Sequence, residues 1–106
     1  MIRVIKEIWV KPAEGGPEDW EQLPLVPATA TLKVKTTQEK AGLLKTYNLS
    51  ATLRREVPIL SKNLRVRIRY DEGHETFGTQ DLPVRFETEQ ENRLTISAKY
   101  KAQGNP

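Results

Sequence analysis

Alternation of apolar and polar residues with a period of two is the feature that most constrains this chain. It runs through residues 28–36, 43–53, 64–70, 82–88 and 94–101. Successive side chains of a β-strand point to opposite faces, so each run predicts a strand with one face in a core and one in water. Threonine, valine, isoleucine and aromatic residues, which favour strands, are frequent in these runs. The sequence therefore predicts an all-β fold of antiparallel strands.

The apolar residues of these runs form the predicted core. Within each run they share one parity, and a slip of one residue would expose the whole set to water. The predicted inward-facing residues are Leu32, Val34, Tyr47, Leu49, Leu53, Val66, Ile68, Val84, Phe86, Leu94, Ile96 and Tyr100.

Turn-forming residues separate the runs. Asp71-Glu72-Gly73 predicts a hairpin in which residues 74–79 return beside residues 64–70. Six or seven strands in a chain of 106 residues predict an antiparallel β-sandwich of immunoglobulin-like architecture. A small β-barrel is the alternative, because the number of strands does not separate the two.

The chain is expected to form one domain over residues 1–106. Residues 11–27 hold four of the seven prolines and predict a long connecting loop packed on the core, with a helical turn near residues 17–20. A second short helical turn is predicted at 36–42, and residues 102–106 are predicted to be a frayed tail.

The residues that carry catalysis or bind metals are scarce. The chain has no cysteine and one histidine, His74, which lies in the predicted hairpin and is expected to be exposed. A metal site usually needs three or four converging ligands, and a nucleophilic triad needs a positioned base. No glycine-rich phosphate-binding motif occurs. We therefore expect no catalytic site, no metal and no cofactor, and a protein that is not an enzyme.

The first ten residues predict a strand that is apolar on both faces. Ile5 and Trp9 lie on the opposite parity to the other apolar residues of this run. A terminal edge strand of this kind favours pairing with another chain, so Ile5 and Trp9 are candidate interface residues for a protein partner or a homo-oligomer. Alternatively, the connection at residues 11–27 covers the second face.

Basic residues are concentrated in the middle of the chain. Residues 43–70 hold seven basic residues and one acidic residue. Among them Arg65, Arg67 and Arg69 (the arginine row) occupy alternate positions, about 7 Å apart on one face of a strand. If neighbouring strands add Arg85, Arg93, Lys99 and Lys101, the patch is large enough for an anionic polymer.

The alternative for the arginine row is a hydrated sheet face, the interpretation that the sequence favours. No exposed aromatic residue is expected to interleave with the arginines, so base stacking has no support.

The sequence contains no apolar segment long enough to span a membrane and no signal peptide, which predicts a cytoplasmic location. The expected function is a non-catalytic interaction or structural module that assembles with itself or another protein. By analogy at the level of the fold, it resembles components of larger assemblies such as viral or mobile-element particles. The alternative is a domain that binds the nucleic-acid backbone through a basic strand face.

Overall fold

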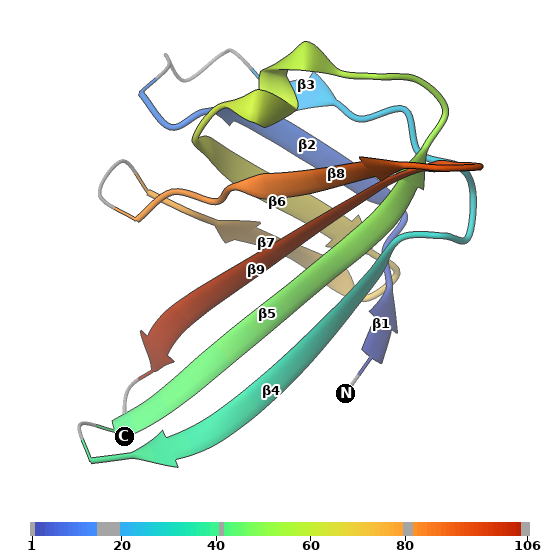
Figure 1. Cartoon of the computed structure of the whole chain (residues 1–106). Helices are drawn as coiled ribbons and strands as arrows, with labels where there is room; N and C mark the ends of the chain where they lie inside the picture. Colours follow the sequence, from blue (N-terminus) through green and yellow to red (C-terminus); the bar gives the residue numbers. More distant parts are fainter. Residues whose placement is uncertain (1, 15–19, 41, 80–81, 105–106) are drawn as a thin grey trace.

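The computed structural model describes residues 2–14, 20–40, 42–79 and 82–104, which form two antiparallel sheets packed face to face (Figure 1). The five-stranded sheet has the order β1-β4-β5-β9-β8, and the four-stranded sheet has the order β3-β2-β6-β7. Neither sheet closes on itself, so the predicted β-sandwich is confirmed and the alternative of a small closed barrel is wrong.

The elements along the described residues are nine strands and one short 3₁₀ helix. In chain order they are β1 (Ile2–Val4), β2 (Glu7–Pro12), β3 (Glu21–Gln22), β4 (Thr31–Glu39), β5 (Gly42–Leu53), η1 (Pro58–Ser61), β6 (Leu64–Tyr70), β7 (Gly73–Phe77), β8 (Phe86–Gln90) and β9 (Leu94–Gly104).

The core lies between the two sheets and follows the parity of the sequence. Every residue predicted to face inward is either buried or packed against the buried cluster, so that prediction is confirmed. At the centre Ile8, Leu64, Val66 and Ile68 are fully buried. The hairpin after β6 is also confirmed, because Tyr70 pairs with Gly73 across a two-residue turn.

The first ten residues do not form one strand, because the chain changes sheet between Ile5 and Lys6. The Ile5 amide donates to the Ala30 carbonyl beside β4 (2.9 Å), and the Lys6 amide donates to the Arg69 carbonyl in β6 (2.7 Å). At this change the Ile5 side chain enters the core, where it is 3% exposed. The apolar residues on both parities thus serve two sheets, and a single two-faced strand was the wrong interpretation.

Two further predictions about local structure are wrong. Of the predicted helical turn at 36–42, the described residues 36–40 and 42 form none: β4 continues to Glu39 and pairs with β5 down to Gly42, whose φ of 125° suits a tight hairpin. The tail is not frayed from residue 102, since β9 runs to Gly104 beside β5. The helical turn predicted near residues 17–20 lies mostly outside the described residues.

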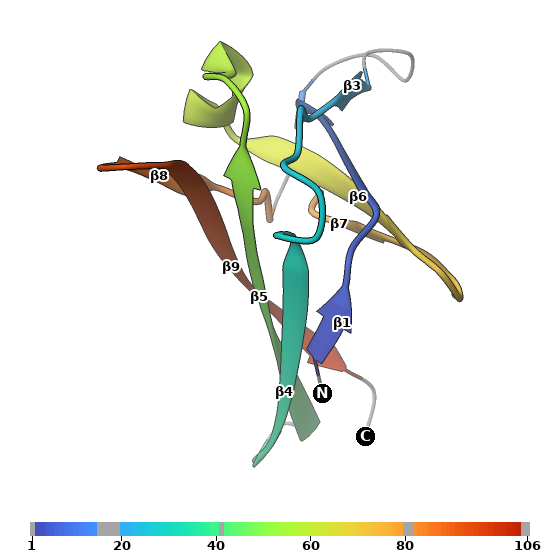
Figure 2. The same ribbon diagram turned by 90° about the vertical axis from the view of Figure 1, so that its right-hand side faces the viewer.

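The five-stranded sheet is longer than the four-stranded one. The hairpin of β4 and β5, with β9 beside it, extends past the end of the second sheet (Figures 1 and 2). At the opposite end η1 lies beside the end of the sandwich (Figures 1 and 2).

Candidate interaction surfaces

The arginine row lies on the outer face of the four-stranded sheet, where each guanidinium has a partner within the chain. Arg69 donates to both carboxylate oxygens of Glu7, at 2.9 and 3.1 Å. The Arg65 Nε donates to the Gly78 carbonyl at 3.1 Å. The Arg67 guanidinium carbon lies 4.4 Å from the centre of the Trp20 ring, a cation–π contact. These contacts favour the hydrated-face interpretation of the row.

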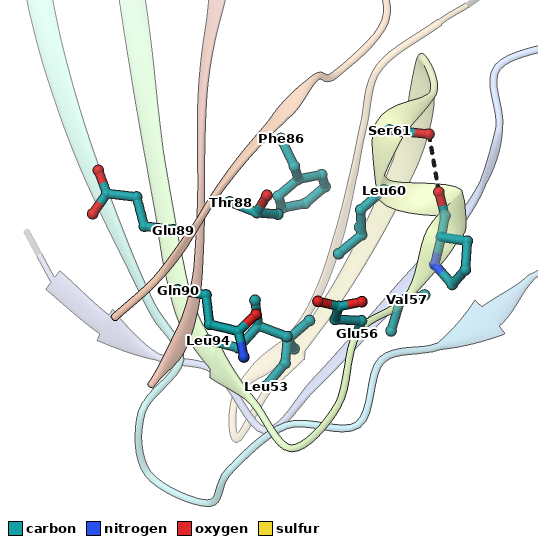
Figure 3. A pocket seen from close by; sticks show the side chains of 11 residues that line it. Leu53, Glu56, Val57, Leu60, Ser61, Phe86, Thr88, Glu89, Gln90 and Leu94 are labelled. Carbon is teal, nitrogen blue, oxygen red and sulfur yellow. Dashed lines mark hydrogen bonds between the residues drawn. The ribbon is translucent and has the colours of Figure 1, made fainter. Parts of the chain in front are cut away.

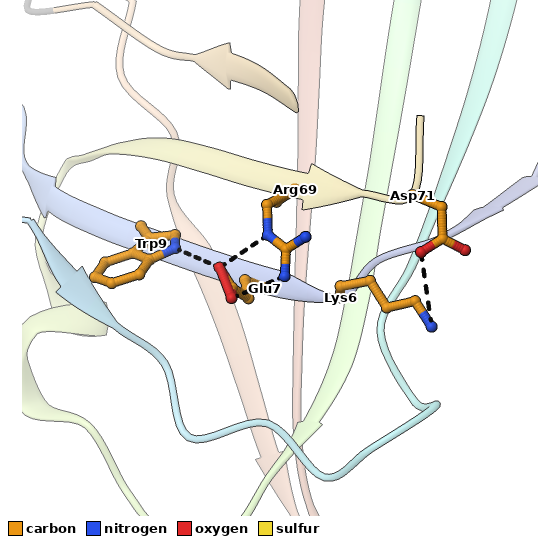
Figure 4. A network of polar contacts seen from close by, with 5 residues as sticks. All are labelled: Lys6, Glu7, Trp9, Arg69 and Asp71. Atoms are coloured by element: carbon orange, nitrogen blue, oxygen red, sulfur yellow. Dashed lines mark hydrogen bonds and ion pairs between the residues drawn. The ribbon is translucent and has the colours of Figure 1, made fainter. Parts of the chain in front are cut away.

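Glu7 is the centre of a polar network on this face (Figure 4). Besides the two bonds from Arg69, it accepts a hydrogen bond from the Trp9 indole at 3.3 Å. The bonds from Arg69 and then from Trp9 lower the pKa of the Glu7 carboxyl from its ordinary value of 4.5. Beside this network Lys6 and Asp71 form a longer ion pair of 4.0 Å.

The lowered pKa of Glu7 makes the network sensitive to acid. As the pH falls, the Glu7 carboxyl is protonated in the unfolded chain before it is protonated in the folded protein. Its contribution to the free energy of unfolding is therefore complete above pH 4.5, and it is lost as the pH falls through the lower pKa of the folded state. We expect Glu7→Gln to unfold at lower urea concentration than wild type at neutral pH, and the difference to vanish well below pH 4.5. Glu14→Gln, at an exposed carboxylate, is the control. A difference that persists unchanged in acid would contradict this account.

Ile5 and Trp9, the candidate interface residues, have different surroundings. Ile5 is buried by its own chain, so its assignment to an exposed interface is wrong. Trp9 is half-buried on the outer face of β2, which lies between β3 and β6 and is not an edge strand. The large exposed apolar side chain in this region is Val4, which is 53% exposed on β1.

Aromatic side chains do lie beside the arginine row, contrary to the expectation from the sequence. Trp9 is directly opposite Arg67 in the β2–β6 register. Trp20, from the long connection, contacts Arg67 and also lies 5.2 Å from the Lys11 ammonium. The connection could not be placed over this face from the sequence, because proline-rich loops carry no periodicity.

His74 is exposed on β7, as predicted. Among the described residues, no three histidine, aspartate or glutamate side chains gather closely enough to hold a metal ion. Within the same part of the chain, no helix has the length and apolar character needed to cross a bilayer.

Arg85 and Lys99 do not join the arginine row. They lie on the outer face of the five-stranded sheet, on the other side of the sandwich, where both line a groove of about 590 Å³. Lys33 lines the same groove from β4. The sequence pattern missed Lys33 because only the register of β4, β5 and β9 brings these strands together.

A second groove, of about 540 Å³, lies between β8 and η1 and is called the β8 groove below. Its lining combines apolar residues of four segments with a few polar ones (Figure 3). Around the open space lie Leu53, Val57, Leu60, Phe86 and Leu94.

The polar side chains of the β8 groove point in different directions. Thr88 and the Glu56 carboxylate point toward the open space, whereas Glu89 points away (Figure 3). β8 itself pairs only with β9, at the end of the five-stranded sheet. One wall of the groove is therefore an edge strand.

No family model matches this sequence, and comparison with curated proteins and with solved structures finds no similar chain. Function must therefore be argued from these surfaces alone.

Proposed function

We propose that this chain is a non-catalytic interaction module that binds an extended segment of another protein chain in the β8 groove. The observation that carries the proposal is an apolar groove with an edge strand as one wall. A segment lying along such a strand gains main-chain hydrogen bonds from the edge, and its alternate side chains enter the groove. The segment therefore has apolar residues at alternate positions.

The composition of the groove supports a protein segment. Leu60 and Leu53 form part of a floor continuous with the core, while Phe86 and Leu94 are only half-buried and have contact area left for a partner. Burial of apolar area contributes about 25 cal/mol per Å². The Glu56 carboxylate, which faces the open space of the groove, favours a basic residue in the bound segment.

The N-terminal strand is a weaker route to assembly. β1 spans only Ile2–Val4, and short edge strands are one way in which proteins avoid pairing. Arg3 on this strand lies 3.6 Å from Glu72, so the local charge is already partly compensated. β8 offers five residues together with an apolar groove.

A library of displayed random decapeptides, selected on the wild-type protein, tests the proposal. Selected peptides should alternate apolar residues, and labelled protein should show amide shifts at residues 86–90 and 57–61 on binding. Thr88→Arg places a long charged chain in the groove and should weaken binding at least tenfold, about 1.4 kcal/mol. The change is at an exposed position, so the fold should be retained.

Thr95→Arg is the matched control, because Thr95 is exposed on the neighbouring strand, opposite Glu89, on the other face of the same sheet. It should bind the selected peptides as wild type does. Failure to select any peptide, or equal binding by both variants, would overturn the proposal. Sedimentation of the protein alone tests for a second copy as the partner: an oligomer lost in Thr88→Arg would identify it.

A further inference from the structure

The outer face of the five-stranded sheet gathers five cationic side chains. We call it the basic face, and its cations are Lys33, Lys35, Arg85, Lys99 and Lys101. Three of these, Arg85, Lys99 and Lys101, were candidates from the sequence. The other two come from β4, which is far from β9 in the chain and separated from it in the sheet only by β5.

The register arranges these cations in two rows across the strands. In the first row Lys33 lies opposite Asn48, and Asn48 lies opposite Lys99. Phe86 pairs with Ala98, so Arg85 extends this row on the far side of Lys99. With strands about 4.8 Å apart, the first row spans roughly 14 Å.

The second row is two residues further along the strands, roughly 7 Å away. In it Lys35 lies opposite Thr46, and Thr46 lies opposite Lys101. Thr46 is only 9% exposed although it points outward, which is consistent with the lysine stems lying over it. The lysine ammonium groups remain at the surface, since all four lysines are exposed.

The basic face has an excess of positive charge over Glu87, the described carboxylate in its groove. None of its five cations lies within 4.0 Å of a described carboxylate, whereas Arg69 in the arginine row has a close partner in Glu7. Glu87 lines one side of the groove without pairing. The floor of the groove adds neutral hydrogen-bonding groups, among them Asn48, Ser50 and Ser97.

We propose that the basic face binds the phosphate backbone of duplex nucleic acid without reading its sequence. Five cations spread over two rows match a polyanion better than a single phosphate, because a duplex presents one charge per about 1.7 Å of its axis. Hydroxyl and amide groups between the cations are typical donors to phosphate oxygens. No aromatic residue occupies an outward position on β4, β5 or β9, so the face offers no stacking platform for unpaired bases.

Fluorescence anisotropy with a labelled DNA duplex of about 20 base pairs tests this site. At about 50 mM salt the wild-type protein should bind with micromolar affinity, similarly for unrelated sequences. The variant with Lys33→Ser, Lys35→Ser, Lys99→Ser and Lys101→Ser should lose at least tenfold in affinity. Its log–log salt slope should also fall by about 0.9 for each phosphate contact removed.

The matched control carries Lys40→Ser, Lys45→Ser, Lys62→Ser and Arg93→Ser, four exposed cations outside the basic face. Its net charge changes by the same amount, and it should retain most of the affinity. Circular dichroism and thermal melting should show both variants folded. An equal loss of affinity in the two variants would show that only the net charge of the protein matters, and it would overturn the assignment of the site to the basic face.

Three other results would also overturn the proposal. The first is the absence of duplex binding by the wild-type protein at low salt. The second is binding of the protein to vesicles that contain anionic lipid, without binding to the duplex. The third is loss of duplex binding in the variant with Arg65→Ser, Arg67→Ser and Arg69→Ser but not in the lysine variant, which would move the site to the arginine row. None of these experiments depends on the β8 groove, so the two proposals stand or fall separately.

Discussion

Val66→Asp is expected to lower the melting temperature by roughly 15 °C or more, enough to leave much of the protein unfolded near body temperature. Val66 is 0% exposed, between Val10 on β2 and Phe77 on β7. A carboxylate there has no cation beside it, and an uncompensated buried charge costs about 3–5 kcal/mol. That is a large part of the roughly 5–15 kcal/mol that stabilises a domain. Thermal unfolding followed by circular dichroism measures the effect.

Thr76→Asp is the control for this substitution. Thr76 is exposed on the outer face of β7, directly opposite Arg67, so a carboxylate there is hydrated and near a cation. Its effect should stay within about 0.5 kcal/mol. If Val66→Asp melted close to wild type and Thr76→Asp did not, the register of the four-stranded sheet would have to be shifted by one residue. If both variants melted close to wild type, the burial of Val66 would be wrong.

Gly78→Ala is the second substitution with a large expected effect. Gly78 has a φ of 89°, and a Cβ there would lie 2.9 Å from the Leu64 carbonyl oxygen and 3.1 Å from a Val84 methyl. The backbone strain costs about 1–2 kcal/mol, and the crowding adds about 1–3 kcal/mol because Leu64 and Val84 are hydrogen-bonded to each other. We expect a loss of about 2–5 kcal/mol in the free energy of unfolding, measured by urea denaturation.

Gly73→Ala separates crowding from the general cost of losing a glycine. The nearest atom to a Cβ at Gly73 is in the Tyr70 ring, 3.9 Å away, so the added methyl makes an ordinary van der Waals contact without crowding. Its φ of 159° lies at the edge of the range that side chains rarely adopt, so backbone strain remains. The loss should be smaller than that of Gly78→Ala by about the 1–3 kcal/mol of crowding. Equal losses of unfolding free energy in the two variants would mean that the close approach of Gly78 to the paired Leu64 and Val84 does not affect stability.

The sequence determined the core well because burial in a sandwich follows parity. Most of the predicted inward residues, such as Val66 and Ile96, have polar neighbours on both sides, and only one register hides the apolar set. Parity did not predict the positions of Ile5 and Trp9. The chain changes sheet beside Ile5, and two hydrogen bonds to distant segments, which no local pattern reveals, make that change.

The surfaces depend on which strands are neighbours, and that information is absent from a single sequence. The basic face needs Lys33 and Lys99 on either side of β5. The β8 groove needs Leu60 and Phe86 on facing segments. The arginine row was visible because all three residues lie on one strand, but Glu7, which holds Arg69, is sixty-two residues away. The spacing of charged residues along one strand therefore does not predict which surface of the folded protein keeps cations without an ion-pair partner.

The position of β9 has a consequence for how the chain folds. β9 follows β8 in the chain, yet it lies inside the sheet, between β5 and β8. Until β9 is in place, β8 has no strand beside it and β5 keeps an open edge beside apolar residues. Pairing of distant segments makes folding slow, on the scale of about milliseconds to seconds. During that interval, or after proteolytic loss of β9, the unpaired edges of β5 and β8 are sites of aggregation. Pairing of β9 with both strands removes these exposed edges.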